Sequence, residues 1–179
     1  MKFLLPAHGV ALAALFLVTG CGGAAPGVTD AAPAQKGTAL AASEVARPPA
    51  IPDDVTDAEA APLNDAGEIA SEIGSNTMIE RVPVQGGLAW RQDGEVLRTV
   101  SRDGQRVAYF HPGEDRPFLV QKGGLAFAYE GGRAQLAYDD QGRPARMSDR
   151  ARAEAERLAD RSRRERDEAE RAPPATPGE

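Results

Sequence analysis

The chain has 179 residues, a formal net charge of -6, a single cysteine and only 5% aromatic residues. One cysteine excludes an intramolecular disulfide, and the lack of a basic excess argues against a nucleic-acid partner, which requires clustered Lys and Arg. The acidic excess lies between Cys21 and Ser75, and the segments that follow are nearly neutral. We therefore expect this negative charge to keep the N-terminal part soluble and to make it repel itself.

The first twenty residues have the form of an export signal. Lys2 supplies positive charge near the start, and an apolar run extends from Gly9 to Val18. This run is too short for a membrane-spanning helix, which needs ~20 residues, but it has the length of a signal-peptide core. The sequence therefore predicts a signal peptide over residues 1–20.

The apolar run ends in Val18, Thr19, Gly20 and Cys21, which resembles the lipobox of bacterial lipoproteins, with Val18 where Leu is commoner. The resemblance implies that residues 1–20 are removed and that Cys21 is acylated, and stable membrane anchoring needs more than one acyl chain. No Asp follows Cys21, which in Gram-negative lipoproteins implies the periplasmic face of the outer membrane. The alternative is an ordinary secretory signal with an incidental cysteine.

Residues 21–77 have the composition of a linker. Ala, Gly and Thr are frequent, no hydrophobic period is sustained, and prolines recur at Pro26, Pro33, Pro48, Pro49, Pro52 and Pro62. Because proline removes backbone donors and such a segment buries little apolar area, we expect disorder here. A flexible coil of this length spans roughly 40 Å on average, so it can hold the remaining chain away from a membrane.

One short helix is predicted at the end of this linker, over Leu63 to Ile73. Asn64 or Asp65 can cap it and Gly74 can end it, and Ile69 and Ile73 share one face. Such a helix is too short to be stable alone. It therefore docks on a neighbouring sheet or does not form.

Residues 78–147 contain the predicted core, a small antiparallel β-hairpin meander of six to seven short strands. Turn signals recur at short intervals between runs rich in β-forming residues, at Gln85-Gly86-Gly87, Asp93-Gly94, Asp103-Gly104, Pro112-Gly113, Gly123-Gly124, Gly131-Gly132 and Gln141-Gly142. Strands at this spacing are typical of an all-β meander or barrel, and Asp-Gly is a strong hairpin signal. The fold class is therefore mainly β.

Two-residue hairpin loops fix an expected register. A loop at Gly131-Gly132 pairs Glu130 with Arg133, Tyr129 with Ala134, Phe127 with Leu136 and Leu125 with Tyr138. The same rule at the two Asp-Gly turns pairs Trp90 with Leu97, Leu97 with Phe110, and Val100 with Val107. Trp90, Leu97 and Phe110 then share one face of the sheet.

The reverse face is also apolar, since Val100, Val107 and Tyr109 fall on it. It needs a cover, which can be the short helix, a second layer of sheet or another protein. These three residues are the candidate partner face.

The segment Tyr138 to Arg143 (YDDQGR) resembles the Y-D-x-x-G-R core of YD (RHS) repeats, and Tyr129 to Arg133 is a degenerate second copy. The resemblance implies hairpin units of the kind that stack into β-rich shells around toxins. One to three units cannot enclose a cargo, so no shell function is expected. The alternative is a generic hairpin, in which an Asp-containing turn and a Gly follow an aromatic residue.

A charged helix is predicted over residues 148–172, followed by a disordered tail over 173–179. Ser148 or Asp149 can cap it, and Pro173 and Pro174 end it. Eight arginines and eight acidic residues between 149 and 171 allow many i,i+4 ion pairs: Arg150–Glu154, Arg152–Glu156, Asp160–Arg164, Arg161–Glu165, Arg163–Asp167, Arg164–Glu168, Arg166–Glu170 and Asp167–Arg171. With Leu158 as its only large apolar residue, we expect a solvated helix. A binding arm for a polyanion or an envelope partner is the alternative.

No catalytic, metal or cofactor site is predicted. His111, beside Pro112, has no His or Cys companion for a zinc site and no nucleophile motif for a triad. We therefore expect a lipid-anchored, non-enzymatic envelope protein that binds or scaffolds an envelope protein or glycan. The alternatives are an adaptor or immunity-type lipoprotein of an RHS or secretion system and, third, a hydrolase using carboxylates.

Overall fold

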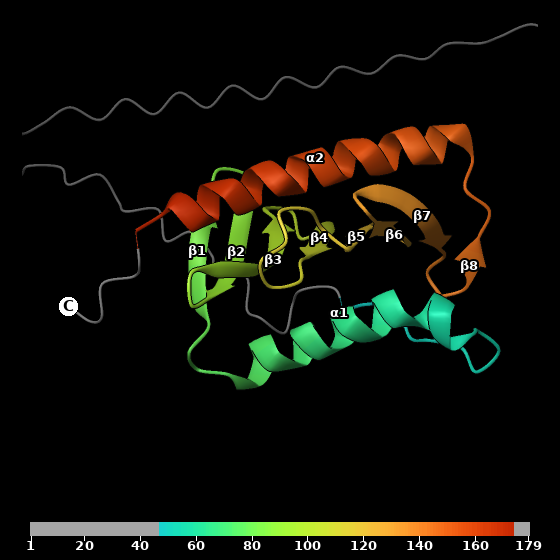
Figure 1. Ribbon diagram of the computed structural model, residues 1–179, viewed down its shortest axis with the longest axis horizontal. Helices are drawn as coiled ribbons and strands as arrows, with labels where there is room; N and C mark the ends of the chain where they lie inside the picture. The colour runs from blue at the N-terminus through green and yellow to red at the C-terminus, as the bar shows by residue number, and fades with distance from the viewer. Residues whose placement is uncertain (1–46, 174–179) are drawn as a thin grey trace, which may run out of the picture. The chain divides into compact units, whose positions relative to one another are not determined.

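The computed structural model describes residues 47–173, which form a helix, a run of strands and a second helix along the chain (Figure 1). In chain order the elements are α1 (Asp57–Ser75), β1 (Glu80–Val84), β2 (Gly87–Gln92), β3 (Glu95–Ser101), β4 (Arg106–Tyr109), β5 (Leu119–Lys122), β6 (Leu125–Glu130), β7 (Arg133–Tyr138), β8 (Pro144–Ala145) and α2 (Asp149–Arg171).

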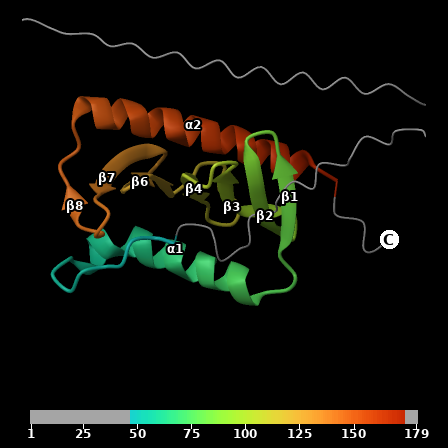
Figure 2. The ribbon, with the colours of Figure 1, turned by 180° about the vertical axis from the view of Figure 1, so that it is seen from behind.

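Within this part of the chain the strands form one eight-stranded antiparallel sheet in which each strand pairs with its neighbours in sequence. The helix α1 lies on one side of the sheet and α2 on the other (Figures 1 and 2). The side chains of each helix form a separate hydrophobic cluster with the sheet. The predicted antiparallel meander with a C-terminal helix is confirmed. The number of strands is eight rather than six or seven, and the sheet lies between two helices.

The first helix forms and is longer than predicted. It begins at Asp57, because Thr56 is the N-cap: its hydroxyl accepts a hydrogen bond from the Glu59 amide, and the Glu59 side chain accepts one from the Thr56 amide. This capping box satisfies amides at the start of the helix. Neither Asn64 nor Asp65 is the cap, and Pro62 lies inside the helix although it removes one intrahelical bond.

The inner side of α1 explains why the helix tolerates that proline. Four buried residues of α1 recur at helical spacing, namely Leu63, Ala66, Ile69 and Ile73. They pack with residues of the sheet in one hydrophobic cluster. Most helical stability in proteins comes from packing such a face rather than from propensity. The docked helix, one of the alternatives that the sequence leaves open, is the one observed.

Val100, Val107 and Tyr109 are therefore covered within the chain. All three are at most 1% exposed and belong to the cluster that contains the α1 side chains. In the described structure they are not an exposed surface to which a partner can dock.

The predicted register is right in part. Glu130 pairs with Arg133, Tyr129 with Ala134 and Val100 with Val107 as expected, and the Phe110 amide donates to the Leu97 carbonyl at 2.9 Å. Two bulges overturn the other pairs, because a bulge shifts the pairing by one residue. The observed pairs are Phe127 with Ala137, Ala126 with Tyr138 and Trp90 with Arg98.

The bulge between β2 and β3 also changes the faces of the sheet. Leu97 is the extra residue, since Arg91 pairs with Val96 and Trp90 with Arg98. Trp90 and Leu97 consequently lie in the α1 cluster, whereas Phe110 lies in the α2 cluster. The predicted alignment of Trp90, Leu97 and Phe110 on one face is wrong.

The second helix is capped by Ser148, one of the two caps predicted, but it is not a solvated helix. Its inner side is buried against the sheet through mostly small residues: Ala155, Leu158, Ala159, Ser162, Glu165, Arg166 and Ala169. The Tyr129 hydroxyl donates to the Ala155 carbonyl at 2.7 Å, and Arg91 donates to the Ala169 and Ala172 carbonyls near the helix end. The prediction counted only large apolar residues. Alanine also forms a buried helix face, because it packs closely and loses no side-chain entropy on burial.

Three acidic side chains of α2 contact the strands or turns of the sheet instead of their predicted arginine partners, namely Glu154, Glu165 and Glu168. Of the eight predicted i,i+4 pairs, only Arg166–Glu170 is formed within residues 47–173, at 2.8 Å. Glu154 pairs with Lys122 of β5, and Glu168 accepts a hydrogen bond from the Gln85 amide. The sheet competes successfully for these carboxylates, which leaves several helix arginines without the predicted partner.

Candidate functional site

A cleft of about 940 Å³ lies between α1, the segment before it and strand β3. Residues 47–51, which we call the strap, form one wall, and α1 forms the other. The lining includes apolar side chains of both walls, Ile51, Leu63, Ala70 and Ile73, and the polar side chain of Arg98 from β3. The lining also includes polar side chains, those of Arg47 in the strap and of Asn64, Glu68 and Ser71 in α1. The cleft thus combines apolar and polar groups, as small-ligand sites do.

The strap is held in place by contacts with the far strands of the sheet. The Gln121 side-chain amide of β5 donates to the Arg47 carbonyl at 3.1 Å. The Ala50 carbonyl packs against Gly142 in the turn after β7, where a Cβ atom would clash with it. Gly142 also has a φ of 76°, a left-handed conformation that favours glycine. Gly142 therefore has two roles: it allows the left-handed turn, and it leaves room for the strap to pack against that turn.

The opposite wall, α1, is fixed by two polar contacts besides its apolar face. The Tyr138 hydroxyl donates to the Glu59 carbonyl at 2.6 Å, and burial raises the pKa of Tyr138 to about 12. His111 Nε2 lies 3.2 Å from an Asp65 carboxylate oxygen, while its ring stacks on Phe118 with centroids 4.0 Å apart. His111 thus joins α1 to the loop after β4.

Arg98 is the distinctive residue of the cleft. It is only 3% exposed, and its guanidinium lies over the Trp90 ring at 4.0 Å from the ring centroid. Two of its nitrogens, Nε and Nη2, are buried and have no hydrogen-bond partner among the described residues. A buried cation without a counter-ion is costly, and the contact with Trp90 offsets only part of this cost.

The surroundings of Arg98 contain polar groups but no partner carboxylate. Burial lowers the pKa of the Arg98 guanidinium, an effect opposed by the nearby Tyr109 hydroxyl. Burial raises the pKa of Tyr109, opposed in turn by Arg98. The Tyr109 hydroxyl itself has no hydrogen bond in the described structure. Arg98 therefore lies beside a buried hydroxyl and has no carboxylate partner among the described residues.

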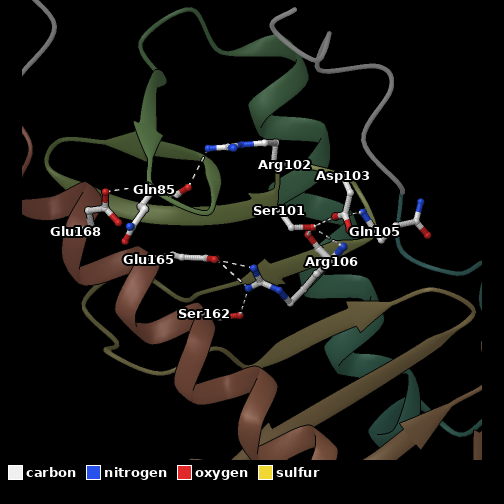
Figure 3. A network of polar contacts seen from close by, with 9 residues as sticks. All are labelled: Gln85, Ser101, Arg102, Asp103, Gln105, Arg106, Ser162, Glu165 and Glu168. Atoms are coloured by element: carbon white, nitrogen blue, oxygen red, sulfur yellow. Dashed lines mark hydrogen bonds and ion pairs between the residues drawn. The ribbon is translucent and has the colours of Figure 1, made fainter. Parts of the chain in front are cut away.

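A second hollow, of about 600 Å³, lies on the other side of the sheet between α2 and the turns before β2 and β4. Figure 3 shows its polar network, in which Arg106 contacts Glu165 through two bonds of 2.6 and 2.8 Å and also Ser162. Arg102 donates to the Gln85 carbonyl at 3.2 Å. The buried charges of this hollow, Arg106 and Glu165, are paired with each other. The hollow therefore has no buried charge that lacks a partner among the described residues, unlike the cleft.

Several residues singled out by the sequence lie elsewhere. Cys21, Val18, Thr19 and Gly20 are outside the described residues. In the turn from Tyr138 to Arg143, the Asp139 carboxylate accepts from the Gln141 and Arg143 amides, each at 2.9 Å. The segment thus forms a turn, which both the resemblance to YD repeats and a generic hairpin predict.

The sequence reading missed the buried arginines. Arg91, Arg98 and Arg106 each lie inside a strand and are 3–6% exposed. Arg98 lies within the run from Val96 to Val100, which is otherwise rich in apolar residues. Arginine is rarely fully buried unless it is paired, so a charged residue in such a run marks a candidate functional residue. Only the structure shows that two of the three are paired.

Comparisons of the chain with protein-family models, with curated proteins and with solved structures found no match. Residues 47–173 contain no cluster of His, Cys, Asp and Glu side chains fit to hold a metal ion. No helix in that range is long and apolar enough to span a bilayer.

Proposed function

We propose that the protein is a lipid-anchored, non-enzymatic binding module of the cell envelope, attached through Cys21 and taking its ligand in the cleft between the strap and α1. The observation that carries this proposal is the cleft itself, which joins apolar walls to one buried, unpartnered cation. The lipobox-like sequence before Cys21 supports the anchor.

The position of the cleft supports the connection between anchor and ligand. The strap begins at Arg47, so the chain that runs from Cys21 leads directly into one wall of the cleft. A ligand seated there contacts the segment that joins the module to its tether. Whether the ligand belongs to an envelope protein, a glycan or a smaller molecule, its binding surface is then on the tethered end of the module.

Substitution Cys21→Ala tests the anchor. The variant is expected to leave the membrane fraction and appear in the soluble fraction of the envelope, because it lacks the thiol that carries the acyl chains. Immunoblots of fractionated cells measure this, with Arg102→Met as a control that keeps the cysteine. A Cys21→Ala chain that stays in the membrane fraction would contradict anchoring. Binding is tested separately, by titrating a neutral apolar probe into the full chain.

A further inference from the structure

We infer that Arg98 binds the anionic group of the ligand, so that the cleft selects a singly charged amphiphile, an anionic head group on an apolar body. This inference rests on the proposed function, since it assigns the ligand class of the same cleft. Nothing in the described residues already fills that role: Glu68, the acidic residue of the lining, is exposed and forms no ion pair with Arg98.

The geometry around Arg98 favours an anion over a neutral ligand. A guanidinium presents several donors in a fixed planar fork that matches a carboxylate or a similar anion. In Arg98 one face is covered by Trp90, and two of the nitrogens lack acceptors. The Trp90 contact orients the fork without satisfying its donors. An anionic ligand placed against the guanidinium would supply the counter-charge that the described residues lack.

The rest of the cleft lining indicates how many charges the ligand's head group carries and which chemistry its apolar body has. Arg98 is the buried cation of the cleft, and the only other cation on its lining, Arg47, is exposed. A multiply charged head group would therefore retain uncompensated charge at a buried position. Ile51, Leu63 and Ile73 supply apolar walls, which favour an aliphatic or aromatic body.

A comparison with the other buried arginines separates this role from a structural one. Arg106 is matched by Glu165, and Arg91 is matched by Glu80 and by carbonyls at the end of α2. Both arginines fasten α2 to the sheet. The Nε and Nη2 atoms of Arg98 have no hydrogen-bond partner within residues 47–173, and Arg98 alone of the three lines the cleft.

Two dyes that differ by one charged group test the inference. Anilinonaphthalene sulfonate carries a sulfonate on the ring system of phenylnaphthylamine, which is neutral, and both gain fluorescence in apolar sites. The full chain carrying Cys21→Ala is titrated with each dye, alone and with Arg98→Met added. We expect Arg98→Met to weaken binding of the sulfonate at least about tenfold and to change binding of the neutral dye by less than about twofold, with Arg102→Met as the matched exposed control.

Two further measurements guard against an effect of folding. Arg98→Met is expected to unfold at the same or a higher urea concentration than the parent chain, because it removes a buried unpaired charge. A marked loss of stability would show that Arg98 has a structural role and would overturn the inference. Without any variant, decanoate should displace the neutral dye more effectively than decanol, although decanol is the more apolar of the two.

The outcomes distinguish the two proposals. If neither dye binds saturably, the cleft is not a binding site and the proposed function fails with the inference. If the neutral dye binds but Arg98→Met leaves the sulfonate affinity unchanged, the binding function stands and the assignment of Arg98 is wrong. Equal displacement by decanoate and decanol would contradict the anionic ligand class in the same way.

Discussion

Replacing Arg106 with Met is expected to lower the free energy of unfolding by about 3–5 kcal/mol, because it leaves the Glu165 carboxylate buried without its partner. The two side chains are 7% and 8% exposed and are joined by two charge-assisted bonds. Urea denaturation of the full chain measures the loss. Trp90, the single tryptophan, is 2% exposed and reports unfolding through its fluorescence.

A double variant separates the pair from the packing around it. Arg106→Met combined with Glu165→Leu removes both charges and is expected to recover most of the lost stability, because well-packed apolar residues often replace a buried ion pair without loss. Arg157→Met is the exposed control: its side chain is 70% exposed in a pair with Glu154, so we expect a change within about 0.5 kcal/mol. A single Arg106→Met variant as stable as the parent would contradict the buried pair.

Substitution Leu63→Ala tests the docking of α1 and is expected to cost about 2–5 kcal/mol. Leu63 is 2% exposed and packs in the cluster that covers Val100, Val107 and Tyr109. Truncation leaves a cavity between helix and sheet, and the loss combines the transfer term with the cavity term. Calorimetry or urea denaturation measures it on the full chain.

The matched control is Leu125→Ala, the same change at a leucine that is 47% exposed at the start of β6. Its expected cost is below about 1 kcal/mol, because little apolar area is lost from a buried site. If Leu63→Ala were no more destabilising than Leu125→Ala, α1 would not be packed on the sheet in solution. The face formed by Val100, Val107 and Tyr109 would then be open to a partner.

The meander could be predicted from the sequence because its determinants are local. Gly-containing turns at short spacing connect neighbouring strands, and a two-residue loop pairs Glu130 with Arg133 as expected. The bulges could not be predicted in this way. Leu97 is an extra residue between Trp90 and Arg98, and nothing in its local sequence distinguishes a bulge from a regular pair.

The helices show a different limit. Thr56 and Glu59 form a capping box that is readable in the sequence, but the prolines around it favoured a linker. Packing of Leu63, Ala66 and Ile69 on the sheet outweighs the cost of Pro62, and that packing is non-local. For α2, local i,i+4 rules predicted eight ion pairs, whereas Lys122 and Arg106 of the sheet take the Glu154 and Glu165 carboxylates.

The candidate site depends both on a bulge in the sheet and on contacts between segments that are distant in the sequence. The sequence correctly indicated an apolar second face, but it assigned Val100, Val107 and Tyr109 to a partner or a cover without deciding between them. Arg98 enters the cleft only because the bulge sets its register and the strap lies over it. Neither the bulge nor the contact of the strap with Gly142 follows from residue types near Arg98.

Binding of neutral phenylnaphthylamine to the full chain, with and without Gly67→Trp, decides whether the cleft is a ligand site. Gly67 lines the cleft, and no atom lies within 4 Å of the position that a Cβ atom would take, so a tryptophan can occupy the cleft. Ala61→Trp, on an exposed part of α1 outside the cleft, is the matched control. We expect saturable binding that Gly67→Trp abolishes and Ala61→Trp preserves. Binding that survives Gly67→Trp would show that the cleft is not the ligand site.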